Sequence, residues 1–170
     1  MARIGVDEAG AGDLAQARAL AAALIDPAIA TEEAIRAIHE RSGCGIYLVR
    51  EGGAVAGIIA MVLLNRTGLA AVEQDSFNPL TPALEHVAQA YEEPAAVYGW
   101  GVAGATREAA TVVVQGSRVA LETIRQPYFA RAATEAGHRM LTAKLGFIPY
   151  PGSTSGLLWR VPHGQTRRAA

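Results

Sequence analysis

The stretch ATEAGHRMLTAKLGFIPYPG, residues 133–152, predicts a helix that ends abruptly. Gly146 can adopt the left-handed conformation that closes a helix, and Phe147 can then pack back on Leu141. Lys144 complements the negative end of the helix, and the two prolines that follow prevent the helix from continuing. We therefore expect a hard stop, followed by a turn into a final strand.

Composition limits what kind of protein this is. With 170 residues, 51% of them apolar, and a net charge of -1, the chain suits one globular domain over residues 1–162 and a flexible tail over 163–170. The near-neutral charge argues against nucleic acid as a partner. Apolar runs are too short for a membrane span, and the lone Cys44 excludes an intramolecular disulfide and a multi-thiolate metal site. These features predict a soluble, cytoplasmic protein that does not bind a membrane.

Periodicity and turn signals divide the chain into helices and strands. Before residue 65 we expect a first strand near the N-terminus and two helices, at 14–24 and 31–43. A hairpin of two strands, at 46–50 and 54–64, follows them. Gly57 marks an expected bulge in the second hairpin strand. After residue 65 we expect an added strand at 68–74 and a short helix at 84–91. Strands at 95–100, 128–133 and 155–161 then alternate with helices at 106–125 and 133–145.

The order of these elements sets the fold class. Strand-helix-strand units in the second half require parallel pairing, whereas the Glu51-Gly52-Gly53 turn joins antiparallel neighbours. We predict an α/β protein with a mixed, mostly antiparallel sheet that contains a parallel strand pair and has helices on both faces.

The helix ending Ala143-Lys144-Leu145-Gly146-Phe147 resembles the "YEKLGF" ending of the penultimate helix in GNAT-superfamily acyl-CoA N-acyltransferases. The order of elements over residues 3–161 is also similar to that fold. The resemblance implies acetyl-CoA as co-substrate and transfer of its acyl group to an amine of a small molecule or peptide. It leaves open a homodimer, and also a domain that has lost catalysis and binds a small ligand or a protein.

In that family a loop after the fourth strand wraps the CoA pyrophosphate with backbone amides at a helix N-terminus. By position we assign this loop to residues Gly101, Val102, Ala103, Gly104, Ala105 and Thr106, with Arg107 in the first helical turn. The match is degenerate, because the leading Gln or Arg of the motif is absent. The alternative, Gln115 to Ala120, keeps that Gln but leaves too short a helix before Tyr128.

No catalytic residue is assigned. The family's tyrosine, a general acid for the departing thiolate, falls on Thr142, whose hydroxyl is too short and too weakly acidic for that role. Glu73 and Asp75 are candidates for a base, although solvated acids are the simpler interpretation. Tyr128 begins a strand beside the expected cleft, and Tyr150 lies past the helix stop; we interpret each as an amphipathic edge residue rather than an acid.

Other polar residues predict no rival chemistry. The histidines at 39, 86, 138 and 163 show no metal-ligand spacing, so no metal is expected. Ser153-Thr154-Ser155 lies in a turn and lacks the strand-turn-helix setting of a nucleophile elbow, and Cys44 has no evident base beside it.

Overall fold

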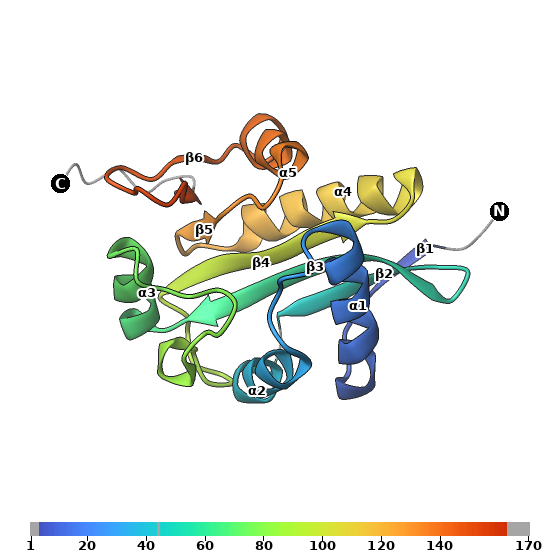
Figure 1. Ribbon diagram of the computed structural model, residues 1–170, viewed down its shortest axis with the longest axis horizontal. Helices are drawn as coiled ribbons and strands as arrows, with labels where there is room; N and C mark the ends of the chain where they lie inside the picture. Colours follow the sequence, from blue (N-terminus) through green and yellow to red (C-terminus); the bar gives the residue numbers. More distant parts are fainter. Residues whose placement is uncertain (1–3, 44, 163–170) are drawn as a thin grey trace.

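The computed structural model describes residues 4–43 and 45–162, which form one mixed sheet flanked by helices (Figure 1). The strands are β1 (Ile4–Glu8), β2 (Ile46–Glu51), β3 (Ala54–Leu64), β4 (Ala96–Gly104), β5 (Tyr128–Ala130), β6 (Ile148–Pro149) and β7 (Leu158–Arg160). The helices are α1 (Leu14–Leu24), α2 (Glu32–Ser42), α3 (Arg66–Glu73), α4 (Arg107–Thr123) and α5 (Glu135–Arg139), which continues as a π-helical turn, Met140–Lys144. Short 3₁₀ turns lie at Ala11–Asp13 and Leu84–His86.

The sheet has the order β1-β2-β3-β4-β5-β7-β6. Only β4 and β5 pair in parallel within the described chain, and the other neighbours are antiparallel. The predicted fold class is therefore confirmed.

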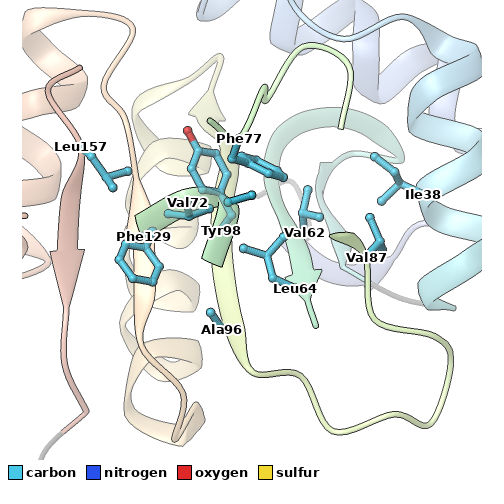
Figure 2. Close-up of a cluster of buried hydrophobic side chains, with 11 residues drawn as sticks. Ile38, Val62, Leu64, Val72, Phe77, Val87, Ala96, Tyr98, Phe129 and Leu157 are labelled. Atoms are coloured by element: carbon cyan, nitrogen blue, oxygen red, sulfur yellow. The ribbon is translucent and has the colours of Figure 1, made fainter. Parts of the chain in front are cut away.

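Alternation along β3 assigns the helices to the two faces of the sheet. Ile58 and Ala60 pack in the cluster that contains α1, whereas Ile59 packs with Ala109 and Val113 of α4. Figure 1 shows α1 and α2 together on one side of the strands and α4 on the other. Figure 2 shows the Tyr98 ring beside Phe77, in a buried cluster that also contains Val62.

Local caps explain where several helices begin. The Thr31 hydroxyl accepts a hydrogen bond from the Ala34 amide, and the Asn65 side chain accepts one from the Gly68 amide. The strand predicted for residues 68–74 was wrong, because the Asn65 cap begins helix α3, which includes residues 68–73. The helix expected over 84–91 was also wrong, because it is a single 3₁₀ turn and Val87 then bridges to Leu64 of β3.

The stop in the stretch 133–152 is confirmed in its main features. Gly146 has φ 74°, in the left-handed region, and Phe147 and Leu141 belong to the same buried cluster. The Phe147 amide donates to the Leu141 carbonyl at 3.0 Å, and the last turn of the helix is π-helical rather than α-helical. Cys44 and the expected tail, residues 163–170, lie outside the described residues.

Candidate functional site

Strands β4 and β5 separate after a short parallel ladder. They pair from Val97 with Tyr128 to Gly99 with Ala130, and β5 ends there, while β4 continues along β3 as far as Gly104. Between Ala60 and Met61 the β3–β4 register shifts, so that Trp100 is an extra, bulged residue on β4. A bulge bends its strand and increases its twist, which turns β4 away from the continuation of β5.

A cavity of about 620 Å³ occupies the gap between the separated strands. On the α1 side it is lined by the α1–α2 connection, including Ile25 and Ile29, and by Leu80. On the other side it is lined by α4 and by α5, including Met140 and Leu141. The cavity therefore passes through the sheet and has walls on both of its faces.

The cavity is largely apolar. In the part of the chain that the structure describes, Asp26 and Arg131 are the charged residues that line it. Trp100, at the bulge, donates from its indole nitrogen to the Pro79 carbonyl at 2.6 Å, which fixes the 74–83 segment at the cavity wall. Such a space suits an uncharged ligand segment with few polar groups.

Asp75 is not the solvated acid that the simpler interpretation expected. Its carboxylate accepts hydrogen bonds from Arg131, at 2.6 Å, and from Ser155, and the amide of Thr154 donates to it at 3.3 Å. The hydrogen bond from Ser155, together with that from Arg131 and its charge, lowers the pKa of Asp75 to about 2. The Ser153-Thr154-Ser155 turn thus holds a carboxylate, and the carboxylate holds Arg131 at the cavity.

The segment assigned to the pyrophosphate loop is only partly a loop. Residues Gly101, Val102, Ala103 and Gly104 belong to β4 and pair with β3, down to Gly104 opposite Gly57. The prediction that the strand ends at Trp100 was wrong, because β3 extends far enough to provide a partner for four more residues. Ala105 and Thr106 form the turn, and Arg107 begins α4 as expected.

Gly104 brings the end of β4 against the first turn of α4. A Cβ added at Gly104 would lie 2.5 Å from the Ala110 nitrogen and 2.6 Å from its Cα. Since backbone atoms cannot move aside as a side chain can, only glycine fits here. The N-terminus of α4 is therefore held at one end of the cavity, whose lining extends to Gly104.

Charges at the N-terminus of α4 are mixed. The Thr106 hydroxyl caps the helix by accepting from the Ala109 amide at 3.0 Å and donates to the Glu51 carboxylate at 2.9 Å. Arg107 and Glu108 are exposed in the first turn. The helix dipole favours an anion at this end, but Glu51 already supplies a negative charge there.

The alternative loop, Gln115 to Ala120, lies in the middle of α4 and has no free helix terminus. Ser117 and Ala120 line the cavity from this helix. The Ser117 hydroxyl is enclosed and has no hydrogen-bond partner in the described structure.

Thr142 does not face the cavity. Its hydroxyl donates to the His138 carbonyl at 2.8 Å, and in the π-helical turn Met140 and Leu141 are the residues that line the cavity. Glu73 is exposed and does not line it. Tyr150 packs edge-on against Phe129 and Trp159, away from the cavity lining.

Tyr128 begins β5 beside the cavity, as the sequence interpretation expected for the cleft. It is 7% exposed and lines the cavity, so the interpretation as an amphipathic edge residue was wrong. Burial raises the pKa of the Tyr128 phenol, which is therefore protonated at neutral pH. Its inward position depends on the pairing of β5 with β4, which the local sequence does not specify.

Within the described residues, no group of three or more His, Cys, Asp or Glu side chains is placed to hold a metal ion. A membrane-spanning helix, long and apolar enough to cross a bilayer, is likewise not found in that part of the chain.

Comparison with known proteins identifies the fold. No protein-family model and no curated protein sequence matches the chain. Among solved structures, the loading GNATL domain of CurA from Lyngbya majuscula is similar, with a TM-score of 0.54 and 13% identity over 76% of this chain. The GphF GNAT-like decarboxylase in complex with isobutyryl-CoA has a TM-score of 0.54 and 12% identity over 82% of this chain.

A third similar structure is the GNAT family N-acetyltransferase YhbS from Escherichia coli in complex with CoA, with a TM-score of 0.53 and 13% identity over 94% of this chain. The match spans 64% of the CurA domain, 71% of GphF and 82% of YhbS, so this chain covers less than two thirds of the first. The protein therefore has the GNAT fold, as the resemblance in its sequence implied.

Proposed function

We propose that the protein binds an acyl-CoA in the gap between β4 and β5 and transfers the acyl group to an amine. The observation that carries this proposal is the cavity that passes through the sheet. Two reactants can approach one point from opposite faces, and such a site can hold an amine close to a thioester for direct attack. Two structural neighbours, GphF and YhbS, bind isobutyryl-CoA and CoA, respectively.

The residues present fit the thin, mostly uncharged arm of an acyl-CoA. Beyond Gly99, β4 pairs only with β3 in the described structure, so backbone groups on its other edge are open to hydrogen-bond a ligand arm and a thioester carbonyl. Thr106 and Arg107, at the start of α4, would hold the pyrophosphate through backbone amides. The Glu51 carboxylate beside them weakens that site.

The α1 side of the cavity would admit the acceptor, a small-molecule or peptide amine. Ile25, Ile29 and Leu80 form much of its wall there, which favours an acceptor with an apolar body. Acetyl-CoA is the simplest donor, and neither nucleic acid nor a membrane is part of the proposal.

Thermal unfolding with and without acetyl-CoA tests the binding step. A ligand at 100 times its Kd stabilises a protein by about 2.7 kcal/mol, so we expect a clear rise in Tm at millimolar acetyl-CoA. Ala105→Glu, which adds a carboxylate at the start of α4 on an exposed side chain, should abolish the rise. Ala143→Glu adds the same charge on an exposed residue away from the cavity lining and should preserve it. An unchanged Tm of the wild-type protein would contradict the proposal.

The second candidate is a GNAT-fold domain that binds a ligand without catalysis. It is favoured by Thr142, whose hydroxyl is bonded to the His138 carbonyl and does not face the cavity. Release of CoA thiol from acetyl-CoA in the presence of a panel of primary amines separates the two candidates. Binding without amine-dependent thiol release would favour the second.

A further inference from the structure

We propose that Arg131 and Tyr98 bind a carboxylate on the acceptor, so that the acceptor is an α-amino acid with an apolar side chain. This inference rests on the proposed acyl-CoA site and names the class of its second substrate. It begins with Arg131, the one cation among the described residues that line the cavity. Apolar walls screen such a charge poorly, so it attracts an anionic group of a ligand.

Arg131 lies where β4 and β5 separate, on the α1 side of the sheet. It follows Ala130, the last residue of β5 that pairs with β4. Phe129, two residues earlier, packs in the cluster that contains Ile38 of α2, and Tyr98, which Arg131 contacts, belongs to the same cluster. Alternate residues of a strand share a face. The guanidinium is therefore on the side that would admit the acceptor, next to the place proposed for the thioester.

The ion pair with Asp75 orients Arg131 without covering it. Arg131 donates from Nη2 to Asp75 and from Nε to the Ser155 hydroxyl, so one edge of the guanidinium is held. Asp75 is not among the described residues that line the cavity, and it also accepts from the Thr154 amide and from Ser155. The cation therefore borders the cavity while its counter-ion lies outside the lining. An arginine held in this way binds a carboxylate with little further loss of side-chain freedom.

The Tyr98 hydroxyl adds a second donor beside the guanidinium. Tyr98 lines the cavity, and Figure 2 shows its ring directed away from Ala96, with the oxygen at the far end. Burial raises the pKa of the phenol, although the charge of Arg131 and a hydrogen bond from it oppose the rise. The hydroxyl is therefore protonated at neutral pH, and it keeps its own proton for a ligand. Guanidinium and hydroxyl together offer donors to both oxygens of a carboxylate.

The rest of the acceptor side suits an apolar group. Ile25, Ile29 and Leu80 line it, and Asp26 lies among them with its side chain exposed. The Asp26 carboxylate disfavours an acidic side chain on the acceptor. An α-amino acid with an apolar side chain fits both parts of the site. Its carboxylate is close to its amine, and so to the thioester, while its side chain extends along the apolar wall.

The transfer would yield an N-acyl amino acid and free CoA. The neutral amine forms a bond to the thioester carbon, the bond from carbon to sulfur breaks, and the sulfur keeps the bonding electron pair. The nitrogen loses one proton to water and the thiolate takes one from water, so atoms and charge balance. Arg131 and Tyr98 hold the acceptor and take no part in the bonds that change.

Acylation of leucine and of leucinamide, which lacks the carboxylate, tests the contact. The measured quantity is the ratio of kcat/KM for leucine to kcat/KM for leucinamide, because a loss of folded protein cancels in it. We expect Arg131→Gln to lower this ratio by roughly 10- to 150-fold, the range for hydrogen bonds to a charged group. Tyr98→Phe, which keeps the ring, should lower it by roughly two- to twelvefold.

Arg50→Gln is the matched control. Arg50 is also a half-buried arginine in an ion pair, with Asp13 at 2.7 Å, and it does not line the cavity. Its loss should leave the ratio unchanged even if the Tm falls. If Arg131→Gln does not fold, Tyr98→Phe decides the question. A ratio that Tyr98→Phe and every folded Arg131 variant leave unchanged would overturn the inference, as would an equal fall in Arg50→Gln.

The wild-type protein separates this inference from the proposed function. Acylation of apolar amines without acylation of leucine would overturn the inference and leave the proposed function standing. If acetyl-CoA neither raised the Tm nor released CoA thiol with any amine, the proposed function itself would fail, and this inference with it.

Discussion

Arg131 at the end of β5 and Asp75 after α3 form an ion pair, with Nη2 and Oδ1 2.6 Å apart. Arg131 also donates from Nε to the Ser155 hydroxyl at 2.9 Å. The two side chains are 22% and 23% exposed, so solvent screens this pair less than an open surface pair. The pair joins three segments that are distant in the sequence, at one wall of the cavity.

Asp75→Asn should lower the Tm, because it removes the charge that holds Arg131 and leaves a half-buried guanidinium with weaker partners. Differential scanning fluorimetry would measure the change. Asp7→Asn is the matched control: Asp7 also pairs with an arginine, Arg50, but at 3.5 Å and with 62% of its side chain exposed. The assignment would be wrong if both variants shifted the Tm equally.

The same carboxylate should make stability depend on pH in acid. The pKa of Asp75 falls from 3.8 to about 2 in the folded protein, so the folded state binds the proton less readily than the unfolded state. The stabilisation is fully present above about pH 4 and is lost as pH falls through about 2. Urea unfolding should therefore show wild type and Asp75→Asn converging between these pH values. A constant difference in unfolding free energy across the range would contradict this.

Gly104→Ala should destabilise the fold by about 1–3 kcal/mol, the usual cost of overpacking, because the new Cβ meets the backbone of Ala110. Gly5→Ala provides a control within β1, since a Cβ at Gly5 has no atom within 4 Å. Chemical denaturation of both variants measures the difference. A Gly104→Ala protein as stable as wild type would show that β4 and α4 can move apart here.

Thr106→Ala should cost about 0.5–2 kcal/mol, because it removes the N-cap of α4. Thr111→Ala lies on the same helix, but its hydroxyl donates only to the Arg107 carbonyl one turn earlier. That change should be neutral or slightly stabilising, since alanine has the higher helix propensity. Equal losses for the two variants would show that the cap contributes nothing specific.

Local signals in the sequence predicted those parts of the fold that local chemistry determines. The Thr31 cap, the Gly52-Gly53 hairpin turn and the stop at Gly146 each depend on a few adjacent residues. The extension of β4 to Gly104 was not predictable in this way, because it depends on β3 as a partner. The ion pair between Asp75 and Arg131 joins residues 56 positions apart, a contact that no local pattern specifies.

The candidate site was less predictable than the fold for the same reason. The place of the α4 N-terminus followed from the order of elements, and Arg107 begins that helix as expected. Tyr128 was interpreted as an edge residue, but it is buried, and its ring lies against Gly99 on another strand. Only the parallel pairing of β4 with β5 brings these two residues together.

The gap between β4 and β5 also divides the sheet into two parts with a narrow seam. Strands β1 to β4 form one continuous ladder, and β5, β7 and β6 form a second, while three residue pairs, from Val97–Tyr128 to Gly99–Ala130, provide the strand pairing between them. Side-chain packing, such as that of Phe129 and Leu157 with Val62, makes the rest of the connection between the two parts. A ligand arm lying in the gap would hydrogen-bond the free edge of β4 as an added strand does, so that ligand binding would also strengthen the connection to the last quarter of the chain.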